Sequence, residues 1–266
     1  MMKHSIVAAM PTKNEEWIIA QTLDALSKFC EKIVVQDDGS TDKTKDICKS
    51  FNKVDLKVRT PSNVLETGMS GRGKADLLGH ARTHDPDYVL MLDADEIPSP
   101  NIIDFLNNID SSINAFNVRM INLMLKDYQG KYHYRTDSFQ TATGAKVIHD
   151  PFDKQGWRKT VLLKVEKDFK YFYEKNTAIG GVSKYHPLPG NIPSPVVDTE
   201  GFYIMHYGKL NEKYISGEKH KTYAKIEEQA GRDSYENRFS HHELCRTGYG
   251  PSGPEYKQCS EDWFWE

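Results

Sequence analysis

The sequence has no long hydrophobic run. No apolar stretch approaches the ~20 residues that a membrane-spanning helix needs. The short apolar segment that ends at Pro11 is also too short for the core of a signal peptide. We therefore expect a protein without a membrane span, located in the cytoplasm.

Cysteine is scarce as well. The 266 residues include four cysteines, and no two of them form a CxxC pair: Cys30, Cys48, Cys245 and Cys259. This density is far below that of a small disulfide-stapled scaffold. We expect reduced thiols, which agrees with a cytoplasmic location, and a bridge between Cys245 and Cys259 remains an alternative.

An excess of positive charge is absent. The chain has 35 Lys and Arg against 38 Asp and Glu, which gives a net charge of −3. This balance argues against nucleic acid or an anionic membrane surface as a partner of the whole chain. An anionic small molecule would have to be bound by local groups. The length of 266 residues and the apolar fraction of 38% allow one large domain or one domain with an appendage.

Short apolar runs alternate with helical patterns in the first hundred residues. The runs have the length and composition of buried strands, and they cover residues 5–10, 32–36, 56–60 and 88–92. Helical spacing or capping follows the first three runs, over residues 16–29, 41–51 and 74–83. This alternation predicts βαβ units, and hence an α/β fold with a Rossmann-like, mostly parallel sheet and helices on both faces.

The pattern changes after Pro100. Strand-like runs cover residues 114–125, 160–165 and 201–206, and a helix with a basic face is expected over residues 211–229. We therefore divide the chain into a domain of residues 1–210 and a helical or irregular C-terminal extension of residues 211–266. Within the domain, residues 1–105 form the half that carries the polar motifs described next.

Three polar segments follow predicted strands, namely residues 11–16, 37–42 and 93–96. Ligands of open α/β sheets bind beyond the carboxyl ends of the strands, so we expect these segments to meet. In Asp93-Ala94-Asp95, two carboxylates two residues apart can both face a divalent cation that also binds phosphate. The alternative is a turn with a helix cap. Residues 37–42 can likewise form a turn with an N-cap, direct a carboxylate at a base or ribose, or do both.

The amino-acid sequences of these three segments resemble those of a known family. PTKNEE after the first strand, VVQDDGSTDKT after the second and LMLDADE at the fourth resemble the three signatures of glycosyltransferase family 2. The resemblance covers residues 5–105 and becomes loose from residue 106 to about 210. It implies a GT-A fold, a UDP-, GDP- or dTDP-linked sugar donor, Mn²⁺ or Mg²⁺, and transfer with inversion to a hydroxyl of a glycan or other acceptor. Residues 1–105 would then bind the nucleotide sugar and residues 106–210 the acceptor.

The resemblance also implies roles for individual residues. It places four residues in the nucleoside pocket: Pro11, Thr12, Asn14 and Glu15. It places Asp38, with Asp37, at the base. Within the third signature, Asp93 contacts the ribose or the metal, Ala94 lies in the nucleotide site and Asp95 binds the metal. Thr12 stands where many members have another residue, such as an aromatic one. Arg72 or Lys74 would contact the diphosphate, and the alternative is a solvated helix start.

The later part of the chain offers candidates for the rest of the site. His206 precedes Tyr207-Gly208, and it would either complete the metal site, since imidazole suits Mn²⁺, or be structural. Transfer needs a carboxylate that takes the proton from the acceptor hydroxyl. The expected Glu-Asp pair is missing between residues 150 and 200. We favour Glu200 or its neighbour Asp198 as this base, with Asp153 and Glu174 as alternatives.

Two other classes of protein compete with this interpretation. A sugar-nucleotide pyrophosphorylase would have a glycine-rich phosphate loop after the first strand, and PTKNEE contains no glycine. A non-catalytic homologue that binds a nucleotide sugar or a glycan should have lost the carboxylates of the metal motif, and Asp93 and Asp95 are present. The sequence therefore predicts an enzyme, a metal-dependent glycosyltransferase.

Overall fold

A computed structural model describes residues 2–60, 71–140, 146–154, 156–166, 192, 194–211 and 254–266 of the chain. The helix expected beyond Asn211 lies outside the described residues, as do Glu174 and Cys245. The backbone of Arg72 is described, but its side chain is not.

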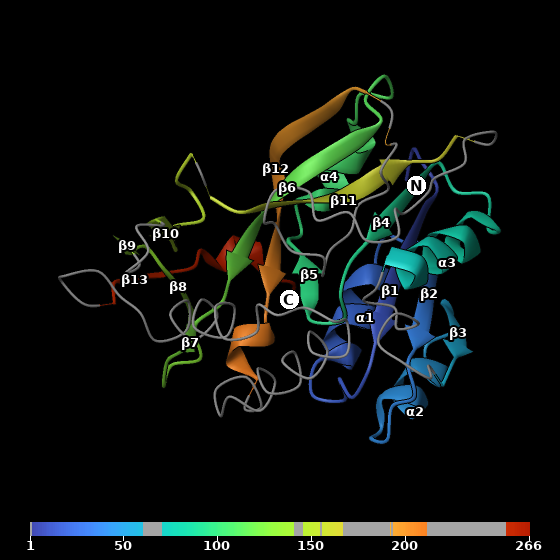
Figure 1. Cartoon of the computed structure of the whole chain (residues 1–266), viewed down its shortest axis with the longest axis horizontal. Helices are drawn as coiled ribbons and strands as arrows, with labels where there is room; N and C mark the ends of the chain where they lie inside the picture. The colour runs from blue at the N-terminus through green and yellow to red at the C-terminus, as the bar shows by residue number, and fades with distance from the viewer. Residues whose placement is uncertain are drawn as a thin grey trace, which may run out of the picture.

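An eight-stranded sheet forms the centre of the molecule, in the order β3-β2-β1-β4-β11-β6-β12-β5 (Figure 1). Its strands are β1 (Ile6–Thr12), β2 (Lys32–Asp37), β3 (Val54–Val58), β4 (Tyr88–Met91), β5 (Glu96–Pro98), β6 (Ala115–Asn122), β11 (Arg158–Lys164) and β12 (Val196–His206). The first four strands pair in parallel, and so do β6 and β12. The remaining pairings, of β11 with β4 and β6 and of β12 with β5, are antiparallel.

Among the described residues, the α-helices that cover the sheet are α1 (Ile19–Ser27), α2 (Thr44–Lys49), α3 (Gly71–Arg82) and α4 (Ile102–Asn107). Every residue of β1 is buried, and alternate residues point to opposite faces of a strand. Ile6, Ala8 and Met10 pack in a cluster with residues of α1, α2 and α4. Val7 and Ala9 pack against α3. The predicted α/β fold with helices on both faces is confirmed.

In the described part of residues 106–210, the strands outside the large sheet are short. They form two small sheets, one of β7 (Leu125–Lys126) and β8 (Tyr132–Arg135) with β13 (Tyr256–Gln258) of the extension, the other of β9 (Ser138–Gln140) and β10 (Lys146–Ile148). Single-turn helices cover Gly208–Leu210 and Glu261–Trp263. Because β13 pairs with β8, the last residues of the predicted extension return to the body of residues 1–210.

Aromatic residues at the C-terminal end of the chain pack against the domain. Trp265 stacks on Phe29 after α1, with ring centroids 6.1 Å apart, and its Nε1 donates a hydrogen bond of 2.7 Å to the carbonyl of Pro98. Tyr132 packs against Phe264. The aromatic end of the chain therefore covers apolar groups of the domain.

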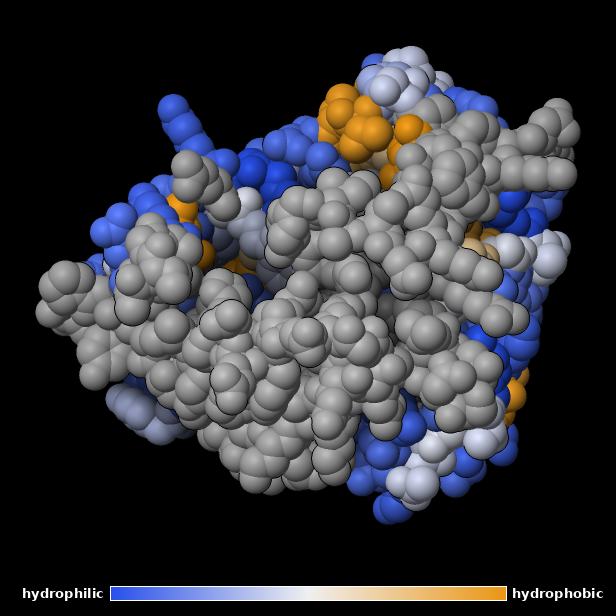
Figure 2. All heavy atoms as spheres, in the orientation of Figure 1, coloured by the Kyte–Doolittle hydropathy of each residue, from blue (hydrophilic) through white to orange (hydrophobic). Residues whose placement is uncertain are grey.

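The described surface is typical of a globular protein. Figure 2 shows a mainly hydrophilic described surface on this face, with apolar residues in a few small patches. Within the described residues, no helix is long and apolar enough to cross a membrane.

Cys30, Cys48 and Cys259 are buried free thiols, and burial raises the pKa of Cys48 and of Cys259 to about 12.

Candidate functional site

The loops that follow β1 and β2, at the carboxyl ends of these strands, are joined by hydrogen bonds. Asn14 has a positive φ of 55°, and its backbone N–H donates to Ser40 Oγ at 2.9 Å. Its side-chain oxygen accepts from the N–H of Thr41 at 2.8 Å. The N–H of Glu15 donates to Thr44 Oγ1 at 2.9 Å. Two residues predicted for the nucleoside pocket therefore shape the loop that would form it.

Pro11 and Thr12 end β1 and are buried. The hydroxyl of Thr12 is a buried polar atom without a hydrogen-bond partner among the described residues. A buried polar group normally has a partner, so an unpaired one at the end of a central strand is compatible with a ligand there. The predicted contact of these two residues with a nucleoside stays a prediction.

The two aspartates after β2 have different surroundings. Asp37 is fully buried and accepts hydrogen bonds from the N–H groups of Gly39 and Ser40, at 3.1 and 2.9 Å. Gly39 has a φ of +81°, which favours glycine. Asp38 instead forms an ion pair of 3.0 Å with Arg59. Asp37 therefore holds the turn, and Asp38 is the better candidate for contact with a base.

Asp93 lies in a buried cluster of four charged side chains. Its Oδ1 is 3.0 Å from Lys74 Nζ, and its Oδ2 is 3.2 Å from Lys159 Nζ. Lys159 Nζ also lies 2.6 Å from Glu96 Oε2, which accepts the N–H of Asp93 at 2.8 Å. Two carboxylates thus face two ammonium groups, and the four side chains balance in charge.

The lysines of this cluster differ from the sequence-based expectation. Lys74 is 3% exposed, so the alternative of a solvated helix start is wrong for it. Lys159 was not predicted at all, because a single lysine in the β11 strand has no local signal. Burial alone would lower its pKa, but the charges of Asp93 and Glu96 outweigh that effect and raise it. Lys159 therefore stays a cation.

Asp95 and His206 form a second pair of candidate ligands. Asp95 Oδ2 lies 3.6 Å from His206 Nε2. The pairing of β12 with β5, and a hydrogen bond of 2.9 Å from the N–H of Tyr207 to the carbonyl of Asp95, bring the two segments together. Both side chains come from residues predicted as metal ligands.

The surroundings of this pair fit a metal ion. His206 Nδ1 is 2.7 Å from the side-chain oxygen of Asn122, so a neutral ring that donates from Nδ1 to this acceptor directs its Nε2 lone pair toward Asp95. A Cβ on Gly208 would lie 2.5 Å from Asp95 Oδ2 and 2.7 Å from His206 Nε2. Glycine is therefore needed at position 208 for the carboxylate and imidazole to approach each other.

Ala94, between the two aspartates, is buried, and its carbonyl accepts a hydrogen bond of 2.6 Å from Thr22 Oγ1 in α1. This bond anchors the Asp-Ala-Asp segment to the body of the domain. A contact between Ala94 and a nucleotide stays a prediction, as does one for Arg72.

The geometry does not favour Glu200 as the base. Arg119 donates hydrogen bonds to both Glu200 oxygens, and Arg158 Nη2 donates to Oε1 at 3.0 Å. The Arg119 hydrogen bond, against partial burial, lowers the pKa of the Glu200 carboxyl. A general base works best with a pKa near the working pH. Thr199, next to Glu200, and His206 pair with Val118 and Asn122 of β6, which are four residues apart, or about 13 Å in an extended strand.

Asp198 lies in the same ion-pair group. Its Oδ1 accepts from Asn117 at 3.0 Å, and its Oδ2 is 3.4 Å from Arg158 Nε. Sequence reasoning missed Arg119, because no local pattern marks a lone arginine in a strand as buried. These contacts indicate a role for Asp198 and Glu200 in holding β6, β11 and β12 together.

Comparison with known proteins identifies a matching family model and several similar solved structures. A family model described as glycosyl transferase family 2 matches residues 7–176. No curated protein matches the chain at a significant level. A solved glucosyl-3-phosphoglycerate synthase from Mycobacterium tuberculosis, in complex with Mn²⁺, UDP and glucosyl-3-phosphoglycerate, is similar at 24% identity and a TM-score of 0.33.

That similarity covers 45% of this chain and 44% of the synthase, so the match spans less than half of the other protein. The crystal structure of S. aureus TarS 1-349 is similar over 91% of this chain and 72% of that one, at 18% identity and a TM-score of 0.45.

Proposed function

The chain belongs to glycosyl transferase family 2 and is a glycosyltransferase, and we propose that it moves a sugar from a UDP-, GDP- or dTDP-linked donor to a hydroxyl of a glycan or other acceptor, with inversion and with Mn²⁺ or Mg²⁺. Residues 1–105 bind the donor in this proposal. Residues 106–210 and the extension of residues 211–266 form the acceptor side.

One observation carries the proposal. Asp95, in the segment after the buried strand β4, and His206, at the end of β12, bring Oδ2 and Nε2 to 3.6 Å from each other beside a glycine that leaves room for both. A carboxylate oxygen and an unprotonated imidazole nitrogen suit Mn²⁺. Asp95 and His206 would hold the ion, which when bound supplies Lewis acidity to the diphosphate leaving group.

The cluster around Asp93 supports binding of the diphosphate. Lys74 and Lys159 bring two buried positive charges beside the metal motif. Positive groups preorganised in a buried site stabilise negative charge more strongly than they would in water. In this proposal they orient Asp93 and offset the negative charge of Asp93 and Glu96, which would otherwise repel the diphosphate.

The loops after β1 and β2 would bind the nucleoside. Asp38 lies at the carboxyl end of β2, and its ion pair with Arg59 orients its carboxylate. The neighbouring Thr12 hydroxyl is unpaired among the described residues. These groups can recognise a base and a ribose by hydrogen bonds.

Calorimetry tests the binding site. UDP, GDP and dTDP are titrated with Mn²⁺ into the wild type, Asp95→Asn and His206→Gln, with and without EDTA. We expect one nucleotide to bind tightly only with Mn²⁺ and each variant to lose at least tenfold in affinity, because nucleotide and metal each supply charge that the other needs. Asp46→Asn, in the exposed part of α2, is the control and should bind as the wild type does.

Release of free nucleotide diphosphate from the sugar donor tests transfer itself. A non-catalytic homologue would bind the nucleotide sugar and release none. Nucleotide binding that is equally tight in EDTA, together with unchanged binding by Asp95→Asn, would show that the proposed metal site is wrong.

A further inference from the structure

A group of three metal-ligating side chains lies away from the Asp95–His206 site. Asp55 comes from β3, the edge strand of the large sheet, and His80 from the last turns of α3, with His84 just after that helix. Two other strands, β2 and β1, separate β3 from β4, which precedes Asp93. At about 4.8 Å per strand this places the group about 14 Å away across the sheet.

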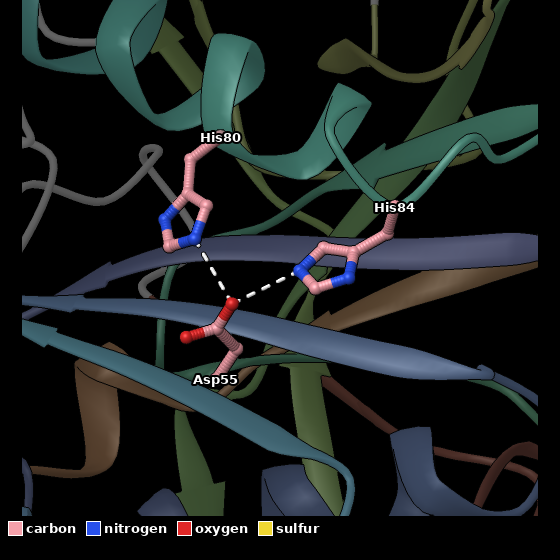
Figure 3. Close-up of side chains that lie close together, drawn as sticks. All are labelled: Asp55, His80 and His84. Carbon is pink, nitrogen blue, oxygen red and sulfur yellow. Dashed lines mark hydrogen bonds and ion pairs between the residues drawn. The ribbon is translucent and has the colours of Figure 1, made fainter.

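The two imidazoles converge on one carboxylate. His80 Nε2 and His84 Nε2 each lie 2.9 Å from Asp55 Oδ2. Figure 3 shows one nitrogen of each ring directed at the same oxygen. His80 lies in α3, and the turn that follows the helix, with the N–H of His84 bonded to the carbonyl of Ala81, keeps His84 on the same side. The three ligand atoms lie within 4.8 Å of one another.

We propose that Asp55, His80 and His84 bind a divalent transition-metal ion of the Zn²⁺ type. Two imidazole nitrogens and one carboxylate oxygen are a donor set that Zn²⁺ accepts, with bonds of about 2.0–2.2 Å. Ligand atoms around a tetrahedral ion at such bond lengths lie roughly 3.3 Å apart. The present Nε2–Oδ2 distances of 2.9 Å are close to that spacing, so small side-chain shifts suffice.

The protonation of the rings allows this binding. Without an ion, each Nε2 lies 2.9 Å from Asp55 Oδ2, a carboxylate oxygen that can only accept, so Nε2 is the donor. When an ion binds, this proton leaves Nε2 and the neutral ring carries its proton on Nδ1. Each Nε2 then offers a lone pair to the ion. The side chains are a quarter to a third exposed, so water can complete the coordination.

The position of the site suggests what the ion does. It would fasten the C-terminal end of α3 to the edge strand β3. The other end of α3 carries Lys74, which contacts Asp93 in the proposed nucleotide site. A bound ion would therefore stabilise the helix that supplies this lysine, without itself touching the nucleotide.

Zn²⁺ alone is the probe for the test. The double variant Asp95→Asn, His206→Gln removes the other candidate site, so failure of the proposed function does not affect the result. We expect this protein to bind one Zn²⁺ per chain. Adding His80→Gln and His84→Gln should weaken that binding at least 100-fold, because even the partners of metal ligands contribute 10–100-fold. His4→Gln is the matched control, because His4 faces a single aspartate at 3.5 Å.

A second measurement does not depend on the folding of the histidine variants. X-ray absorption at the zinc edge of the Zn²⁺-loaded double variant should report two imidazole nitrogens at about 2.0–2.1 Å. Failure of the folded double variant to bind Zn²⁺, unchanged affinity after His80→Gln and His84→Gln, or a spectrum without imidazole would each overturn the proposal. In that case Asp55 simply accepts two hydrogen bonds from the histidines.

Discussion

Lys159 is the residue whose loss should destabilise the protein most clearly. Its ammonium lies 2.6 Å from Glu96 and 3.2 Å from Asp93, and all three side chains are buried. Lys159→Met keeps the length of the side chain but removes its charge. Glu96 would then be a buried carboxylate without a cation, while Asp93 would keep Lys74.

The magnitude follows from the loss of one partner of a buried ion pair, which costs about 3–5 kcal/mol. For a chain of this size each kcal/mol lowers Tm by about 2–4 °C, so the expected decrease is roughly 6–20 °C. Because the folded-state pKa of Lys159 is raised, its stabilising effect is fully present below the unfolded pKa of about 10.4 and is lost only as pH rises through the folded value.

Urea denaturation at neutral pH measures the effect. Lys32→Met, at an exposed position of β2, is the matched control and should change the free energy of unfolding by less than about 0.5 kcal/mol. The double variant Lys159→Met, Glu96→Gln should recover at least about 1 kcal/mol, because the uncompensated charge is gone. A glutamine oxygen at position 96 can still accept the N–H of Asp93.

The result that would refute this reasoning is a loss below about 1 kcal/mol for Lys159→Met, equal to an exposed substitution. It would mean that water or another cation reaches Glu96. Equal stability of the single and double variants would show that the loss comes from packing and not from the charge.

Three further predictions concern other parts of the molecule. Gly208→Ala should fold, but its affinity for the nucleotide in the presence of Mn²⁺, measured by calorimetry, should decrease at least tenfold. The reason is that the new Cβ would lie 2.5 Å from the Asp95 carboxylate. Unchanged affinity would contradict this prediction. Trp265→Ala should lower the free energy of unfolding by about 2–4 kcal/mol in urea, since it removes a partly buried ring and its hydrogen bond. Glu200→Gln should leave the transfer rate unchanged. The arginines bonded to Glu200 lower the pKa of its carboxyl, so the variant should be less stable than the wild type above about pH 4.5. This difference in stability should vanish as pH falls through the folded-state pKa of Glu200. Loss of turnover in the variant would restore Glu200 as the base.

The sequence was sufficient for most strands and helices of the first half, although β5 and α4 were not predicted and β3 begins two residues before the predicted run of residues 56–60. The runs at residues 5–10, 32–36 and 88–92 became β1, β2 and β4, because burial on both faces makes a strand continuously apolar. Of the two functions predicted for residues 37–42, the turn is present and is held by Asp37, whereas contact of Asp38 with a base or ribose stays a prediction.

The contacts of the site were harder to predict. Glu200 has the right chemistry for a base, but its surroundings depend on Arg119 and Arg158, which come from neighbouring strands. Strand pairing decides such contacts, and β11 is inserted antiparallel between β4 and β6. No local pattern in the sequence indicates that insertion.

The sequence by itself determined the family, the order of the elements of the first half, and the placement of the Asp-Ala-Asp segment after a buried strand, because periodicity and strand ends are local properties of the chain. Only the tertiary structure decided that Lys159 neutralises Glu96, that His206 meets Asp95, and that His80 of α3 and His84 just after it meet Asp55. The physical reason is that these pairs are far apart in sequence, and the pairing of strands and the docking of α3 set their distances.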